Sequence, residues 1–456
     1  MTVVTTGPVA DLVAGLGDAV VTDGDTMIAY TRDQALLSPS GQPMAVVRAR
    51  TVDDVVTTLQ TAYRYKIPVV TRGAGTGLAG GANALEGCIV LSTEKMNRIL
   101  EIDEQSRTAT VEPGVVNGDL ATAAAERGLW YVPDPGSRAI STIGGNLATN
   151  AGGPCCAKYG VTGDHVARIK AVLADGRIIH TGAATRKNVA GLNLTQLLVG
   201  SEGTLAVIVE ATMRLRRKLA HASTVVAAFT DPVQAVNAVM AIQNVADPSL
   251  VELMDHNTIT AVNDMTQMGL DESAGALLLI QCDGEAAEAE TDRIAEACRS
   301  CAATELFVTT DPVESDGLMQ ARRVALTALE RCGSTLLDDL AVPVPRLPHM
   351  LDAISRIADR HHLFVGTFGH AADGNLHPTI VFDAADRDAS DRAYRAFDEM
   401  VTRCLALGGS ITGEHGVGDL KRSYLETMVG THERGLMRQI KAVFDPAGIL
   451  NPGRAI

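Results

Sequence analysis

Two glycine-rich segments set the strongest limit on how this chain can fold. The first, Thr71-Arg72-Gly73-Ala74-Gly75-Thr76-Gly77, directly follows a strand predicted at 67–71. The second runs from Ile143 to Gly153. Glycine lets backbone N–H groups turn inward and lets a phosphate approach closely. Each segment alone also fits a tight turn between packed strands. The pair, with Ser201-Glu202-Gly203-Thr204 further on, favours two cradles for a long ligand with a diphosphate and a planar head.

The first segment differs from the common nucleotide-binding loops. It lacks the Gly-Lys-Ser/Thr ending of a P-loop. It also lacks a third glycine that opens a helix at the spacing of the dinucleotide-binding fingerprint. The glycines therefore indicate a phosphate cradle of another kind.

Hydrophobic patterning predicts an α+β protein in several parts. Residues 1–42 are predicted as a helical lead-in, 43–219 as a ligand-binding domain, 220–410 as a second domain and 411–456 as a segment that returns to the first domain. In the first domain we expect strands at 43–49, 67–71, 88–92, 99–103 and 107–112, helices at 52–66 and 117–127, a hairpin at 166–181 and a strand-like stretch at 197–215. In the second, strands near 223–229, 276–282, 304–309 and 363–368 alternate with helices near 231–245, 285–302, 314–331 and 346–361. This alternation predicts an antiparallel sheet covered on one face by helices.

Composition excludes several classes of protein. The net charge of −15 and an aromatic content of 3% argue against a nucleic-acid partner. No apolar run is long enough to span a membrane, and the first twenty residues lack the basic region of a secretory signal. We therefore expect a cytoplasmic protein without a transmembrane segment. Eight cysteines in a chain of 456 residues do not form a disulfide framework.

Two C-terminal segments concentrate side chains that bind metals and protons. Gly369-His370-Ala371-Ala372-Asp373-Gly374-Asn375-Leu376-His377-Pro378 carries two histidines on turn-forming backbone, and Gly413-Glu414-His415-Gly416-Val417-Gly418 carries a Glu-His pair. Two imidazoles and a carboxylate can hold a divalent metal with a position open for substrate. Zn²⁺ suits this set, and Mn²⁺, Fe²⁺ and Co²⁺ remain open. A further histidine can accept a proton near neutral pH. The alternative is a pair of polar loop histidines and a surface loop.

Six ordered motifs identify a family resemblance. They are PVVTRGAGTGLAGG, DPGSRAISTIGGNLATNAGG, LLVGSEGTLAVI, GHAADGNLHP, GEHGVG and DPAGILNPG, spread from about Pro43 to Gly453. Together they resemble the FAD-linked D-2-hydroxyacid dehydrogenases, which include D-lactate dehydrogenases and the flavin subunit of glycolate oxidase, in the vanillyl-alcohol oxidase/para-cresol methylhydroxylase superfamily. The resemblance implies a para-cresol methylhydroxylase-type FAD-binding domain of two α/β subdomains. It also implies an α+β cap domain whose antiparallel sheet is covered by helices.

The resemblance also implies site residues. The FAD contacts would be Arg72, Gly73, Ala74, Gly75, Thr76, Gly77, Pro135, Gly136, Gly144, Gly145, Asn146, Thr149, Gly152, Gly153, Glu202, Gly203, Ile208 and Asn451. The metal ligands would be His370, His377 and Glu414, with zinc as the usual metal, and His415 would be the general base. Arg322 would pair with the substrate carboxylate through the bidentate geometry that arginine favours, although Arg323 is adjacent.

Two departures from the family pattern carry information. Relatives with covalent flavin often carry a histidine where this chain has Thr76, so we expect dissociable, non-covalent FAD. Cys155 or Cys156 as a covalent link is the alternative. The hydroxyglutarate branch carries a lysine where this chain has Leu337, which makes a contact to a second substrate carboxylate less expected.

The expected activity is oxidation of a D-2-hydroxy acid such as D-lactate or glycolate to the 2-oxo acid. Hydride would pass to flavin N5 and electrons to an external acceptor, which is a quinone, an electron-transfer flavoprotein, an iron–sulfur protein or a cytochrome. Alternatives are a D-2-hydroxyglutarate dehydrogenase, a non-redox transferase of the alkyl-dihydroxyacetone-phosphate synthase type, and a non-catalytic flavoprotein subunit. A homodimer and a peripheral position at a membrane through the acceptor also remain open.

Overall fold

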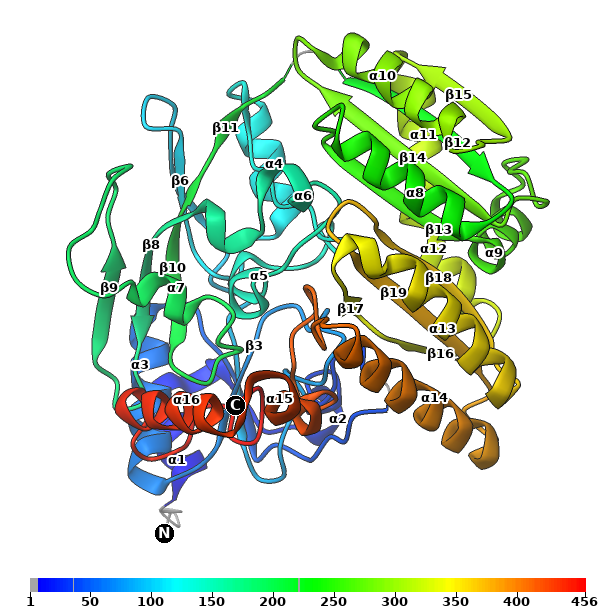
Figure 1. The fold of residues 1–456 in the computed structure, drawn as a ribbon. Helices are drawn as coiled ribbons and strands as arrows, with labels where there is room; N and C mark the ends of the chain where they lie inside the picture. Colours follow the sequence, from blue (N-terminus) through cyan, green and yellow to red (C-terminus); the bar gives the residue numbers. More distant parts are fainter. Residues whose placement is uncertain (1–6, 36, 220–221) are drawn as a thin grey trace. The chain divides into compact units, whose positions relative to one another are not determined.

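The structure, a computed structural model, describes residues 7–35, 37–219 and 222–456. The chain forms two compact units (Figure 1). The first comprises the chain up to Gly152, Val161–Lys218 and Glu414–Ile456, and the second comprises Gly153–Gly160 and Leu219–Gly413. Mixed helices and sheets confirm the predicted α+β class. The lead-in contains helices α1 (Pro8–Leu16) and α2 (Gly24–Ile28), while residues 1–6 of that prediction lie outside the described part.

A small, mainly parallel sheet carries the first glycine-rich segment. Its strand order is β1 (Val20–Val21), β2 (Ala45–Arg48), β4 (Ile89–Ser92) and β3 (Val69–Arg72), with only β1 antiparallel. Continuous runs of buried residues such as Ile89–Ser92 suit a parallel sheet that is covered on both faces. Helix α3 (Val52–Tyr65) connects β2 to β3 and begins at a capping box formed by Thr51 and Asp54.

A second, antiparallel sheet completes the core of the first unit. Its order is β5 (Ile99–Asp103), β6 (Thr108–Val111), β10 (Val207–Arg214), β8 (Val166–Val172) and β9 (Ile178–Gly182). The predicted hairpin turn at Asp175-Gly176 is confirmed between β8 and β9. The strand-like prediction over 197–215 is wrong at its start, because helix α7 (Leu194–Leu198) and a turn precede β10. Asn193 caps that helix by accepting a bond from the backbone of Gln196.

Other elements of the first unit are short helices and strands and the C-terminal helices. Those from the middle of the chain are α4 (Asn117–Ala125), β7 (Leu129–Trp130), α5 (Ile143–Thr149) and β11 (Arg216–Arg217), which pairs with β7. At the end of the chain stand α15 (Arg422–Val429) and α16 (Thr431–Phe444). Beyond α16, Leu450 forms a parallel bridge with Val69. The C-terminus therefore lies beside the strand that leads into the first glycine-rich segment.

The second unit is built on one antiparallel sheet. Its order is β15 (Glu305–Thr309), β12 (Ala222–Phe229), β14 (Ala276–Asp283), β13 (Leu250–Asp255), β18 (Phe364–His370), β19 (Asn375–Phe382) and β16 (Ser334–Leu337), and β17 (Leu340–Ala341) also pairs with β19. The central strands β13, β18 and β19 are the ones that matter for the site. The unit also contains α6 (Cys156–Tyr159).

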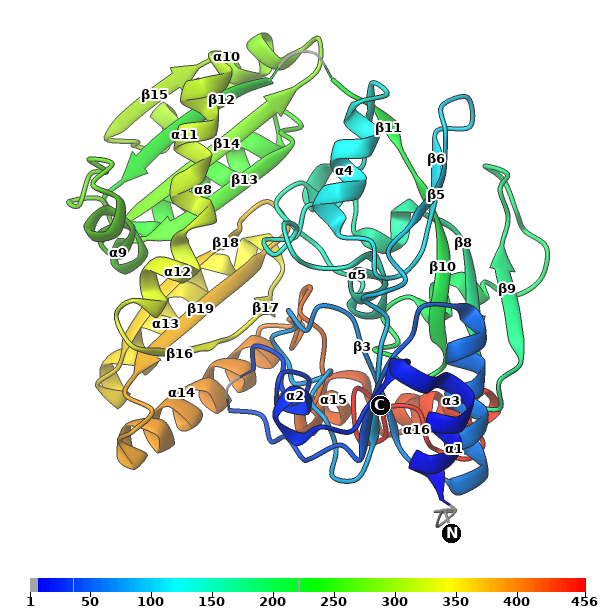
Figure 2. The same cartoon turned by 180° about the vertical axis from the view of Figure 1, so that it is seen from behind.

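Helices cover both faces of this sheet. On one face lie α8 (Pro232–Gln243), α10 (Ala287–Ser300) and α13 (Leu347–His361), as Figure 1 shows, with α14 (Arg387–Ala406) packed against α13. On the other face lie α9 (His256–Thr266), α11 (Pro312–Arg323) and α12 (Ala325–Glu330) (Figure 2). The prediction of helices on one face is therefore wrong. The reason is visible in β14, where alternate residues Leu277 and Leu279 pack with α9, α11 and α12 while Leu278 and Ile280 are buried on the opposite side.

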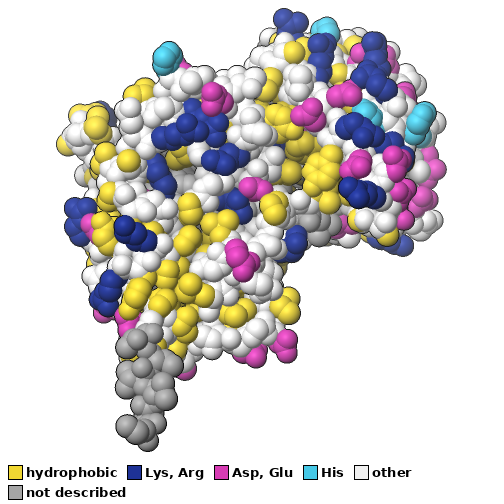
Figure 3. Space-filling view, turned by 90° about the horizontal axis from the view of Figure 1, so that it is seen from below, with side chains coloured by type: hydrophobic (Ala, Val, Ile, Leu, Met, Phe, Trp, Pro, Cys, Tyr) yellow, Lys and Arg dark blue, Asp and Glu magenta, His cyan; other side chains and the backbone are white. Residues whose placement is uncertain are grey.

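On the surface drawn in Figure 3, acidic and basic side chains are interspersed, and apolar side chains gather over part of that face. Among the described residues, no helix has both the length and the apolar character required to cross a membrane.

Candidate active site

The first glycine-rich segment places a buried cation beneath a close backbone turn. Arg72 ends β3 and is 7% exposed, and its Nη1 has no hydrogen-bond partner. Burial lowers the pKa of Arg72, and the nearby charge of Asp33 opposes that shift. A Cβ on Gly75, which has a φ of +72°, would lie 2.0 Å from the guanidinium. Glycine is therefore required at Gly75, and the free Nη1 group fits a phosphate oxygen.

The two glycine-rich segments are packed against each other. A Cβ on Gly73 would lie 2.3 Å from Oγ1 of Thr142, the residue that caps α5 by accepting a bond from Gly145 N. The structure thus brings Gly73 next to the helix that contains Gly144, Gly145, Asn146 and Thr149. The side chain of Asn146 accepts a bond from Nδ2 of Asn117 and donates one to Oγ of Ser141.

The other predicted FAD residues are spread over several elements. Pro135 and Gly136 lie in the loop between β7 and α5, Gly152 ends a segment of the first unit, and Ile208 lies in β10. Gly153 opens the short segment that belongs to the second unit. Asn451 donates from its Nδ2 to the backbone oxygens of Gly81, at 2.9 Å, and Glu202, at 2.8 Å. These two bonds join the C-terminal stretch to the loop that contains Gly81 and to the loop that contains Gly203.

Glu202 holds the backbone that follows His415. Its carboxylate accepts hydrogen bonds from the N–H groups of Val417 and Gly418, each at 2.8 Å. Burial raises the pKa of Glu202 to about 7, even though these two donors favour the charged form. Glu202 was predicted as an FAD contact. The structure shows, in addition, that its side chain holds the backbone of Val417 and Gly418 within the first unit.

Strands β18 and β19 bring His370 and His377 together in the second unit. His370 is paired with Asn375, and His377 lies two residues beyond Asn375, so both histidines are on one face of the sheet. Their rings are edge to face with centroids 5.3 Å apart, and both are almost fully buried. The prediction of turn-forming backbone holds only for residues 371–374, because both histidines belong to strands.

Glu252 in β13 is the residue that the sequence analysis missed. It pairs with His370 across β13 and β18, and its Oε1 lies 2.6 Å from Nδ1 of His370. Its Oε2 forms an ion pair of 2.6 Å with Nε of Arg322, and its side chain is 0% exposed. Burial raises the pKa of Glu252, but His370 and Arg322 outweigh burial and hold it below the ordinary value. The signal was a carboxylate inside the otherwise apolar run 250–254.

The two adjacent arginines of α11 have different surroundings. The Arg322 side chain is 12% exposed, and its Cζ lies 4.6 Å from the centre of the Phe368 ring. The Arg323 side chain is 41% exposed and pairs with Asp316. Arg322 is thus the member of the pair that reaches the histidine cluster.

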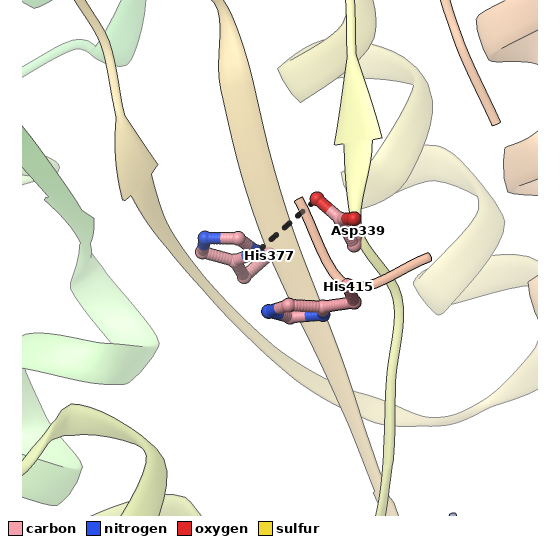
Figure 4. Close-up of side chains that lie close together, drawn as sticks. All are labelled: Asp339, His377 and His415. Carbon is pink, nitrogen blue, oxygen red and sulfur yellow. Dashed lines mark ion pairs between the residues drawn. The ribbon is translucent and has the colours of Figure 1, made fainter. Parts of the chain in front are cut away.

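Asp339 supports the chain that leads to Glu414. Its Oδ2 accepts bonds from Oγ1 of Thr412, at 2.6 Å, and from N of Gly413, at 2.9 Å. Its Oδ1 lies 3.8 Å from Nδ1 of His377 (Figure 4). Glu414 and His415, the latter also drawn in Figure 4, follow Gly413 directly in the chain and belong to the first unit. Oε1 of Glu414 and Nε2 of His415 are 3.7 Å apart.

The cradle, the antiparallel sheet and the buried imidazoles define the class of protein. Residues 43–182 match the family described as FAD binding domain, and residues 218–455 match the family described as FAD linked oxidases, C-terminal domain. The chain therefore belongs to the FAD-linked oxidases and is an FAD-dependent oxidoreductase. The resemblance drawn from the six motifs is confirmed.

Individual relatives and solved structures show similarity over nearly the whole chain. The chain is 42% identical over 418 residues to glycolate oxidase subunit GlcD of Bacillus subtilis, with 90% of this chain and 88% of the relative covered. It is 36% identical over 436 residues to D-lactate dehydrogenase of Archaeoglobus fulgidus, covering 94% and 95%. Among solved structures, p-cresol methylhydroxylase with substrate bound superimposes with a TM-score of 0.82 at 18% identity, covering 98% and 96%. That likeness confirms the predicted fold.

Proposed function

We propose that this enzyme oxidises a small 2-hydroxy acid, glycolate or D-lactate, to the 2-oxo acid, with FAD and a divalent metal, and passes the electrons to an external acceptor. The observation that carries the proposal is the pair of buried imidazoles of His370 and His377 on neighbouring strands, backed by carboxylates. Buried imidazoles whose second nitrogens face carboxylates are typical of metal ligands. The names of the two relatives supply the substrate class.

The side chains present suit both groups. Arg72, with Nη1 unpaired and Gly73 and Gly75 close to it, fits a diphosphate of non-covalent FAD. His370, His377 and Glu414 would supply the neutral imidazoles and the carboxylate that suit Zn²⁺. When bound, FAD accepts the hydride of the substrate C2–H bond, and the metal acts as a Lewis acid toward the 2-hydroxyl oxygen.

The protein side chains would supply binding and proton transfer. Nε of Arg322 faces Glu252, which leaves the two Nη groups to pair with the substrate carboxylate. His415 takes the proton of the 2-hydroxyl group as the C2–H bond breaks. Leu337, in β16, offers no charge for a second carboxylate, which favours a monocarboxylate over hydroxyglutarate.

An anaerobic substrate panel with metal analysis tests the proposal. The FAD- and zinc-loaded protein is mixed with glycolate, D-lactate, L-lactate, D-malate and D-2-hydroxyglutarate, and the absorbance of oxidised flavin is followed. We expect bleaching by glycolate or D-lactate, and its loss after treatment with a chelator. H415N should bind FAD normally and reduce it at least ~100-fold more slowly, which is the usual scale of general-base catalysis. Absence of bleaching by every acid, or normal reduction in H415N, would contradict the proposal or the assignment of the base.

A further inference from the structure

We propose that Glu252 is a positioning residue that holds a metal ligand, His370, and the substrate-binding Arg322 from behind with one carboxylate. The inference rests on the proposed function, because it takes His370 as a ligand and Arg322 as the substrate cation. What it adds is a connection between these two residues. Metal affinity and substrate affinity would both depend on the side chain of Glu252, which touches neither the metal nor the substrate.

The strand register places Glu252 where it can do this. Glu252 on β13 and His370 on β18 are direct cross-strand partners, and such partners present their side chains on the same face of the sheet. The 2.6 Å contact to Nδ1 therefore follows from backbone pairing in the middle of the sheet. A fully buried carboxylate is costly unless it is paired and hydrogen-bonded, and Glu252 has both kinds of partner.

The contact determines which nitrogen of His370 carries the proton. A carboxylate paired with an arginine accepts hydrogen bonds and donates none. The proton of the neutral imidazole must therefore lie on Nδ1, toward Glu252, and the lone pair must lie on Nε2. A carboxylate behind a ligating histidine also raises the basicity of the ligand, and its removal lowers metal affinity by about 10- to 100-fold.

The carboxylate of Glu252 also restrains the side chain of Arg322. Its Oε2 holds Nε of Arg322 at 2.6 Å, while the ring of Phe368 lies against the guanidinium at 4.6 Å. Phe368 also neighbours His377, with ring centroids 5.5 Å apart. Glu252 and Phe368 thus connect α11 to the two histidine strands. Without Glu252, Arg322 would keep only the ring contact, so the geometry of its remaining donors would be lost.

The test compares E252Q with a matched control, D255N. Asp255 lies at the end of the same strand and is partly buried, but its carboxylate accepts bonds from the backbone N–H groups of Thr258 and Thr367 instead of contacting a histidine. Full-length, FAD-loaded protein is stripped of metal and titrated with Zn²⁺ against a chromophoric chelator. Substrate KM and kcat are then measured at saturating Zn²⁺, and Co²⁺ spectra report the ligand field.

We expect E252Q to bind Zn²⁺ about 10- to 100-fold more weakly, to show a changed Co²⁺ spectrum and to have a raised KM at saturating metal. D255N should keep the zinc affinity and Co²⁺ spectrum of the wild type. If E252Q does not fold, E252D takes its place, since it keeps the charge but is too short to hold both partners. If the wild type binds Zn²⁺ and the Glu252 variant binds it with equal affinity, this inference is wrong and the proposed function stands. A wild type that binds no Zn²⁺ overturns the proposed metal site as well.

Discussion

Replacing Glu202 by Gln should change how the stability of the first unit depends on pH. Glu202 is a buried carboxylate that accepts two backbone N–H groups from the segment after His415. Its pKa is raised from 4.5 to about 7, mainly by burial. Glutamine has nearly the same shape as the protonated acid but does not titrate. The variant therefore isolates the contribution of this one ionisation.

The sign and size follow from the two pKa values. Because the native state holds the Glu202 proton more tightly than the unfolded chain, the stabilisation is fully present below pH 4.5 and is lost as the pH rises through about 7. At about 1.4 kcal/mol per pH unit, the full difference corresponds to roughly 3 kcal/mol. Between about pH 5 and about pH 8, the free energy of unfolding of the wild type should fall by about 2 to 3 kcal/mol relative to E202Q.

The chain contains a fluorescent probe for unfolding of the first unit. Its single tryptophan, Trp130, lies in β7 of the first unit. Urea unfolding of the FAD-free protein, followed by Trp130 fluorescence, reports on this unit. Asp255, whose pKa is also raised by burial, to about 6, lies in the second unit and is therefore not followed by this probe. Parallel pH profiles for wild type and E202Q would refute the reasoning, since the gap between them is the predicted quantity.

The remaining predictions concern the second unit. R322M should destabilise that unit by about 3 to 5 kcal/mol in urea unfolding and raise KM, because it leaves the charge of Glu252 buried without its arginine partner. R323A, which removes an exposed pair, should cost less than about 1 kcal/mol and leave KM unchanged, and equal effects of the two would contradict the assignment. D339A should lose the bonds to both Thr412 and Gly413 and cost about 2 kcal/mol or more, measured in the same way, while an unchanged stability would show that these bonds contribute nothing.

The sequence predicts the first unit well because its signals are local. The strand at Ile89–Ser92, the capped helix Val52–Tyr65 and the Asp175-Gly176 turn each depend on a few neighbouring residues. The error at the start of 197–215 has the same origin. Apolar residues such as Leu197 and Leu198 fit a strand or a short buried helix equally well, and only packing decides between them.

The strands that carry the site are harder to predict. Pro378 lies in the middle of β19, although a residue without an N–H group argues against a central strand. It is accommodated where the neighbouring strand is interrupted between β16 and β17, and its carbonyl accepts a bond from Asp338 N. Glu252 could not be assigned a partner, because it lies 118 residues before His370 and only the sheet register brings the two together.

The glycines around Glu414-His415 have a common physical reason. Before the dipeptide, Gly413 N is bound by Asp339, and a Cβ on Gly413 would lie 2.3 Å from the Asn375 side chain. After it, Gly418 N is bound by Glu202, and a Cβ on Gly418 would lie 2.0 Å from the carbonyl oxygen of Ala79. A buried carboxylate therefore holds the backbone on each side of the two residues assigned to metal binding and proton transfer. Gly413 and Gly418 let this anchored backbone pass close to Asn375 and Ala79, so the spacing of the GEHGVG motif reflects anchoring of the chain as well as chemistry.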